Sequence, residues 1–121
     1  MKTILIVDDE PDITDVVTST LQDEGYRVLA ASNGLEGLRR LNEATPDLLI
    51  CDLMMPFMDG VTMCQRIRSD PQYQDLCIII ASVMDKPTVT SQFSHYDGYL
   101  RKPYRLGALL ELVDSLIEKP H

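Results

Sequence analysis

The chain has 121 residues, of which 45% are hydrophobic and 25% charged, and its formal net charge is −8 at pH 7. This length suits one domain with a single core, which would span residues 1–121. The excess of acidic residues argues against direct nucleic-acid binding. No apolar run is long enough to span a membrane, and the start Met1-Lys2-Thr3 lacks the pattern of a signal peptide. We therefore expect a cytoplasmic chain that does not contact membranes.

The first half of the chain predicts three strands separated by two helices. An apolar strand at Thr3–Val7 precedes a helix whose apolar face includes Val16, Val17 and Leu21. Residues 27–31 predict the second strand. A helix capped by Asn33 follows it. Residues 48–52 predict a nearly all-apolar third strand, which is typical of a strand that helices cover on both faces.

The second half continues this alternation. Residues 60–69 predict a helix, residues 77–82 a buried strand and residues 99–101 a short strand, and the last helix carries an apolar stripe from Leu106 to Ile117. Between residues 85 and 97 large apolar side chains are few, so we expect a short or weakly stable helix there. Strands that alternate with helices in this way predict a doubly wound α/β fold around a parallel sheet.

Polar side chains stand where four of these strands end. Asp8 and Asp9 follow the first strand, Asp52 ends the third, Ser82 ends the fourth and Lys102 follows the fifth. The carboxyl ends of parallel strands lie on one edge of a sheet, so we expect these groups to share one pocket. Crowded carboxylates repel one another unless a cation joins them, and Mg²⁺ prefers such oxygen ligands. Asp9 and Asp52 are the best direct ligands, and we expect Asp8 to act through a water.

A carboxylate in such a pocket is also a potential nucleophile toward phosphorus, and its product is an aspartyl phosphate. The cation and Lys102 would then neutralise charge on the transferred phosphoryl group, while Ser82 would donate its hydroxyl to a phosphoryl oxygen. An isolated Asp-Asp pair is usually only a solvated turn. The prediction therefore depends on the joint occurrence of all these groups.

Four segments of the sequence form a recognisable pattern: Ile6-Val7-Asp8-Asp9-Glu10, Asp52-Leu53-Met54-Met55-Pro56 followed by Asp59-Gly60, Ala81-Ser82, and Tyr99-Leu100-Arg101-Lys102-Pro103. In order and spacing they resemble the receiver domains of the two-component response-regulator family, and the resemblance covers essentially the whole chain. It implies the flavodoxin-like receiver fold, with a five-stranded parallel sheet in the order 2-1-3-4-5. It also implies a signalling switch, not an enzyme in the usual sense, that catalyses its own Mg²⁺-dependent phosphorylation and dephosphorylation.

The resemblance further implies a role for individual residues. Asp52 would be the phosphoacceptor, and the donor would be a phosphohistidine on a sensor histidine kinase or a phosphotransfer protein. Asp8, Asp9, Asp52 and the main-chain carbonyl of Met54 would hold Mg²⁺.

The same resemblance implies how the signal is read. Ser82 and Tyr99 would be the paired switch residues. Lys102, together with Ser82 and Val83, would contact the phosphoryl group, and the Lys102-Pro103 bond is commonly cis in this family. Output would pass to a downstream protein target or through self-association, without direct contact to nucleic acid.

The sequence departs from the family pattern at two places. Val83 stands where a small residue is usual, and Ser94-His95-Tyr96-Asp97-Gly98 replaces the usual Gly-Ala-Asp before the last strand. Val83 is the only support for the alternative function, a phosphate-independent pseudo-receiver that acts purely as an interaction module. A true aspartate-dependent phosphatase would need an acid two residues after its nucleophile, and Met54 stands there.

Overall fold

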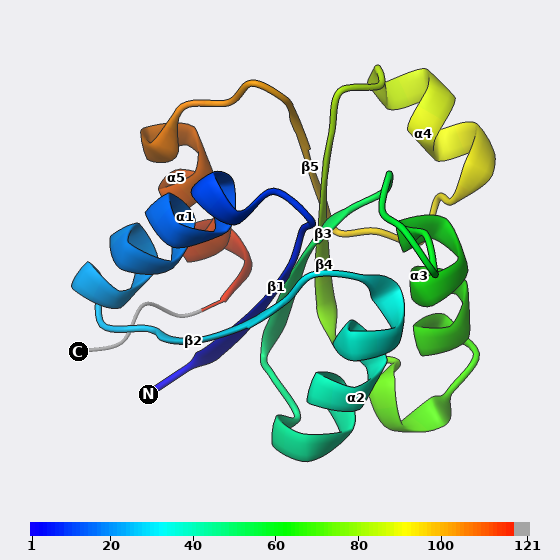
Figure 1. Cartoon of the computed structure of the whole chain (residues 1–121), viewed down its shortest axis with the longest axis horizontal. Coiled ribbons are helices and arrows are strands. Elements are labelled where there is room, and N and C mark those ends of the chain that lie inside the picture. Colours follow the sequence, from blue (N-terminus) through cyan, green and yellow to red (C-terminus); the bar gives the residue numbers. More distant parts are fainter. Residues whose placement is uncertain (118–121) are drawn as a thin grey trace.

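The computed structural model describes residues 1–117, in which strands and helices alternate along the chain (Figure 1). No helix in this range is both long and apolar enough to cross a membrane. The elements are β1 (Thr3–Val7), α1 (Pro11–Asp23), β2 (Arg27–Ala31), α2 (Gly34–Ala44), β3 (Leu48–Asp52), α3 (Gly60–Arg68), the 3₁₀ turn η1 (Pro71–Tyr73), β4 (Cys77–Ser82), α4 (Lys86–Gln92), β5 (Gly98–Arg101) and α5 (Leu106–Leu116).

The five strands form one parallel sheet in the order β2-β1-β3-β4-β5. This confirms the predicted fold class and strand order. Helices cover both faces: α1 and α5 pack on one face, and α2 and α3 pack on the other (Figure 1). The central strand β3 is buried along its whole length, which explains why its sequence is apolar up to Asp52. All five carboxyl ends therefore lie at one edge of the sheet.

Three helices begin at this edge with side-chain caps. Asn33 accepts a hydrogen bond from the Glu36 backbone N–H at 2.9 Å, which confirms its predicted role at the start of α2. Asp59 caps α3 by accepting from Thr62 N at 2.8 Å. Asp85 caps α4 by accepting a hydrogen bond from Thr88 N at 2.9 Å. These caps fix where each helix starts and so fix the paths of the loops around the edge.

The apolar faces of α1 and α5 are narrower than the sequence pattern indicates. Val17 is buried in α1, but Val16 is exposed. In α5 only Leu109 and Val113 are buried, and Leu106 is exposed at the first turn. Val16 and Leu106 instead line one groove between α1 and the start of α5.

The helix α4 is short, as the scarcity of apolar residues predicts. It has seven residues, and Val89 is its one buried side chain. Phe93, the residue that follows α4, is also buried and anchors its end. A helix held by so few buried groups is weakly attached to the sheet, so small changes at its start are able to move it.

Candidate functional site

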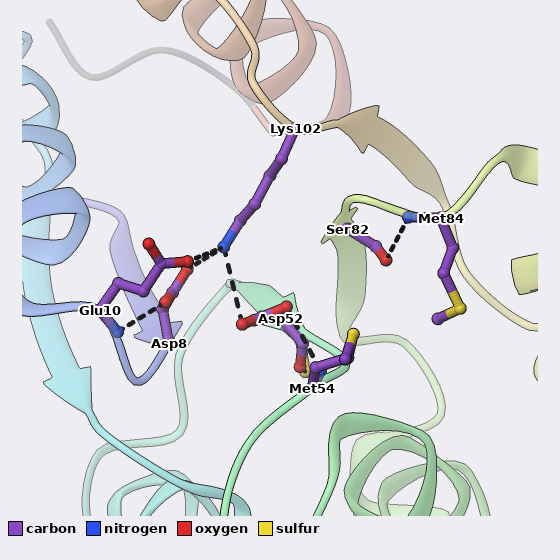
Figure 2. Close-up of polar contacts among 8 residues, drawn as sticks. Asp8, Glu10, Asp52, Met54, Ser82, Met84 and Lys102 are labelled. Carbon is purple, nitrogen blue, oxygen red and sulfur yellow. Dashed lines mark hydrogen bonds and ion pairs between the residues drawn. The ribbon is translucent and has the colours of Figure 1, made fainter.

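An acidic pocket lies at the carboxyl edge of the sheet, above β1 and β3 (Figure 2). Asp8 follows the last residue of β1 and is 6% exposed, and Asp52 is the last residue of β3 and is 7% exposed. Carboxylate oxygens of Asp8, Asp9, Glu10 and Asp52 all lie within 4.8 Å of one another. Such a set of hard oxygen donors is suited to a divalent cation.

The side chain of Lys102 reaches into this pocket from the end of β5 (Figure 2). Its Nζ lies 2.7 Å from Asp8 Oδ2, 3.3 Å from Glu10 Oε1 and 3.6 Å from Asp52 Oδ2. Burial opposes its charge, but the hydrogen bond to Asp8 and the charge of Asp52 outweigh that effect and raise the pKa of Lys102. The ammonium group therefore stays charged at neutral pH and offsets part of the negative charge. The Lys102-Pro103 bond is cis, as the resemblance implies.

The pKa of Asp52 is raised above the ordinary value for an aspartate. Burial is the largest cause, and the negative charges of Asp8 and Asp9 add to it, while Lys102 and a hydrogen bond from Met54 N act in the opposite direction. The ionised form of Asp52 is therefore less favoured in the pocket than in water. A bound divalent cation would add positive charge and favour the ionised form.

Backbone groups hold the two buried carboxylates in place. Asp8 Oδ1 accepts a hydrogen bond from Glu10 N at 2.9 Å, and Asp52 Oδ1 accepts one from Met54 N at 3.4 Å. The loop after Asp52 returns to α3 at Gly60, where an added Cβ would lie 2.2 Å from the main-chain oxygen of Asp52. Only glycine permits this close approach, and it keeps the loop that carries Met54 tight against the pocket.

Ser82 and Tyr99 both bind the backbone of Met84. Ser82 is fully buried, and its Oγ accepts a hydrogen bond from Met84 N at 3.1 Å (Figure 2). The Tyr99 hydroxyl donates a hydrogen bond to the main-chain oxygen of Met84. Tyr99 is also turned inward, since its ring packs against the buried core beside Tyr96. The two predicted switch residues are thus linked through the backbone of one residue, Met84, in the loop before α4.

Two other predicted site residues lie at the rim of the pocket. Met54 and Val83 are both exposed, and Met54 projects from the loop that follows β3. Glu10, by contrast, belongs to the pocket although the site predicted from the sequence omits it. The position of Glu10 directly after Asp8-Asp9 could have indicated that it belongs to the pocket. Its contact with Lys102, however, joins residues 92 positions apart, and no local pattern in the sequence predicts that contact.

A family model of the response regulator receiver domain matches residues 4–114. This chain belongs to that family. It is a receiver domain of the two-component response regulators, which are signalling switches phosphorylated on an aspartate. The match includes every residue of the acidic pocket and both predicted switch residues.

Curated relatives of the receiver domain are longer response regulators. The DNA-binding dual master transcriptional regulator RpaA of Synechocystis is 36% identical over 123 residues, which is 98% of this chain and 50% of the relative. The transcriptional regulatory protein TrcR of Mycobacterium tuberculosis is 35% identical, over 96% of this chain and 45% of the relative. The receiver domain thus spans about half the length of these relatives.

Solved structures similar to the receiver domain match almost its full length. The chemotaxis response regulator CheY4 of Vibrio cholerae superposes with a TM-score of 0.91 at 31% identity, covering 97% of this chain and 99% of that one. The response regulator TrrA of Thermotoga maritima, solved in complex with Mg²⁺ and BeF, gives a TM-score of 0.87 at 33% identity, covering 97% and 100%. These matches agree with the strand order and the helical layers described above.

Proposed function

We propose that Asp52 of this receiver domain accepts the phosphoryl group, and that Asp8, Asp9 and Asp52 hold Mg²⁺ with the main-chain carbonyl of Met54. The observation that carries the proposal is the pocket itself, in which acidic oxygens within 4.8 Å of one another surround a buried aspartate beside a lysine ammonium. The related TrrA was solved with Mg²⁺ and BeF, which shows that a similar receiver binds this cation.

The residues present fit a magnesium ion. Every donor is an oxygen, and burial together with the negative charges of Asp8 and Asp9 raises the pKa of Asp52. Mg²⁺, when bound, would neutralise the clustered carboxylates and the oxygens of an incoming phosphoryl group.

In the transfer step, a carboxylate oxygen of Asp52 forms a bond to phosphorus while the phosphorus–nitrogen bond of a donor phosphohistidine breaks, and the imidazole leaves. The donor is a sensor histidine kinase or a phosphotransfer protein. Lys102, whose Nζ is already 3.6 Å from Asp52 Oδ2, contacts the transferred phosphoryl group and offsets its charge. In a separate step, water attacks phosphorus, the Asp52 carboxylate leaves and inorganic phosphate is released, so the domain also dephosphorylates itself.

The signal leaves the pocket through the backbone of Met84. In the structure Ser82 Oγ is hydrogen-bonded to Met84 N. When the Ser82 hydroxyl instead donates to a phosphoryl oxygen, this contact is lost and the loop before α4 rearranges against Tyr99. Because α4 has one buried side chain, its surface changes readily, and a downstream protein or a second copy of the chain reads the change.

This proposal predicts where a phosphoryl mimic acts. Addition of beryllofluoride and Mg²⁺ should shift backbone amide signals of residues 83–99 more than those of residues 13–21 in α1, as measured by two-dimensional NMR. Ser82→Ala should reduce these shifts at least severalfold without weakening Mg²⁺ binding. Ser115→Ala, on the far side in α5, serves as the matched control. Equal shifts throughout the chain would contradict the proposed path, and failure to bind the mimic would favour a pseudo-receiver.

The phosphoryl group is expected to persist longer than in receivers with polar residues around the site. Met54 and Met84 each stand two residues past a site residue, and neither side chain positions an attacking water by hydrogen bonding. Hydrolysis needs water in line with the breaking bond, and such alignment is worth orders of magnitude in rate. Met54→Asn combined with Met84→Glu should therefore speed loss of radiolabelled phosphate about tenfold or more in excess Mg²⁺.

Val83 is expected to restrict access to the same bond, so Val83→Ala should speed phosphorylation from small donors. Two results would show that these side chains do not control hydrolysis. One is loss of the phosphate label from the wild type within seconds, and the other is loss from the Met54→Asn, Met84→Glu double variant that is no faster than from the wild type.

A further inference from the structure

Phe57 combines an unfavourable backbone conformation with an exposed aromatic side chain. It lies in the loop between β3 and α3 with a left-handed φ of 66°, and its side chain is 85% exposed. The Met58 N–H donates to the Pro56 carbonyl oxygen at 2.7 Å, which closes a tight turn around it. For a bulky residue this conformation is strained, and the exposed ring provides little packing to offset the strain.

The neighbouring packing forces this conformation on residue 57. Met58 is buried, and its main-chain oxygen accepts a hydrogen bond from Gly34 N at 3.1 Å at the start of α2. An added Cβ at Gly34 would lie 2.7 Å from that oxygen, so the two loops are in close contact. Holding Met58 inward pushes residue 57 outward. Glycine adopts a positive φ without strain, so folding alone would favour glycine at this position.

Phe57 shares a hollow of about 270 Å³ with the first two turns of α2. Leu35, which is 54% exposed, lines the hollow from the first turn, and Arg39 lines it from the next. Arg39 forms no ion pair with any residue in the described range 1–117. The hollow thus offers two apolar side chains beside a cation that has no ion pair in this range, and Asn33 and Glu36 complete its lining.

The position of this hollow links it to the acidic pocket. Of the seven large hydrophobic residues that are exposed in the described range, five lie on the first turns and loops around the carboxyl edge of the sheet. Val16 lies in the second turn of α1, and Met1 lies elsewhere. On one side of Asp52, a groove of about 580 Å³ runs between α1 and the start of α5 and includes Lys102. Leu35, Met54 and Phe57 lie toward α2 and α3. Exposed apolar residues gathered around one site indicate a protein interface.

We infer that Phe57 and Leu35 form a second contact for the phosphodonor protein, on the α2 side of Asp52, and that Phe57 helps to select the donor. The inference rests on the proposed role of Asp52, because a donor that reaches Asp52 meets this edge of the sheet and covers both sides of the pocket. A rigid aromatic side chain is an efficient anchor for an apolar side chain of a partner. Arg39 would pair with a carboxylate beside that side chain. A small donor such as acetyl phosphate enters the pocket without this contact.

The test compares a protein donor with a small one. The protein donor is the histidine kinase that phosphorylates the wild-type chain fastest in a panel of all purified kinases from the source organism. Phe57→Gly should slow transfer from this kinase at least tenfold and leave phosphorylation by acetyl phosphate unchanged. Leu35→Asn should act in the same direction. Gln65→Ala, an exposed position on α3, is the matched control and should leave both rates unchanged.

Thermal unfolding of Phe57→Gly provides the check on folding. Its Tm should rise, because glycine relieves the strained turn. Unchanged transfer from the kinase, an equal loss with acetyl phosphate, or a lower Tm would each overturn the inference. So would a wild-type chain that accepts phosphate from acetyl phosphate but from no kinase. If the wild type accepts phosphate from neither donor, the proposed function itself fails.

Discussion

Asp52→Asn should abolish phosphorylation by acetyl phosphate in the presence of Mg²⁺. The amide is a poor nucleophile, and no other carboxylate in the pocket is placed at the end of the central strand β3. Intact-protein mass spectrometry should show one added phosphoryl group on the wild type and none on the variant. Asp15→Asn, an exposed aspartate on α1, is the matched control and should be phosphorylated normally. Label that persists in Asp52→Asn would refute the assignment of the phosphoacceptor.

The stability of the same variant checks the electrostatics of the pocket. Burial raises the pKa of Asp52, so the folded state binds a proton more tightly than the unfolded state does. The stability of the metal-free wild type should therefore fall as the pH rises from the ordinary aspartate pKa through the raised one. At pH 7 in EDTA, Asp52→Asn should be more stable than the wild type in urea unfolding, because it removes the buried charge. If Asp52→Asn is less stable than the metal-free wild type at pH 7, the predicted direction of the stability change is wrong.

Asp9→Ala should weaken Mg²⁺ binding by about a hundredfold or more, the effect expected when a direct ligand is removed. Its carboxylate belongs to the cluster of acidic oxygens within 4.8 Å of one another. Isothermal titration calorimetry with Mg²⁺ would measure the affinity. The fold should remain intact, because Asp9 is exposed and contributes no buried packing.

Asp12→Ala separates ligation from general charge. Asp12 is an exposed acid in the first turn of α1, so its removal changes the net charge equally without removing a member of the cluster. Its Mg²⁺ affinity should stay within a factor of about two, because exposed charges are screened by salt. Equal weakening by both variants would point to long-range electrostatics and not to a ligand. Without metal, Asp9→Ala should be at least as stable as the wild type, because it removes one of the mutually repelling charges.

The sequence by itself determined the fold and the pocket residues that stand at strand ends. Apolar runs such as Leu48–Asp52 alternate with helical patterns, and this periodicity specifies a parallel sheet covered on both faces. Parallel strands all point their carboxyl ends to one edge. Residues that end strands, such as Asp8, Asp52 and Lys102, are therefore brought together by topology alone. The short α4 also follows from composition, because its segment has few apolar residues to bury.

Only the tertiary structure decided how these residues pair. Lys102 lies nearest Asp8 and also contacts Glu10. These contacts depend on the positions of side chains that come from opposite ends of the chain. The direction of the Ser82 hydroxyl depends on its rotamer. The strained turn at Phe57 depends on the contact between Met58 and Gly34, which no local pattern encodes. Periodicity specifies which face of an element is buried, but rotamers and pair distances are set by packing between elements far apart in the sequence.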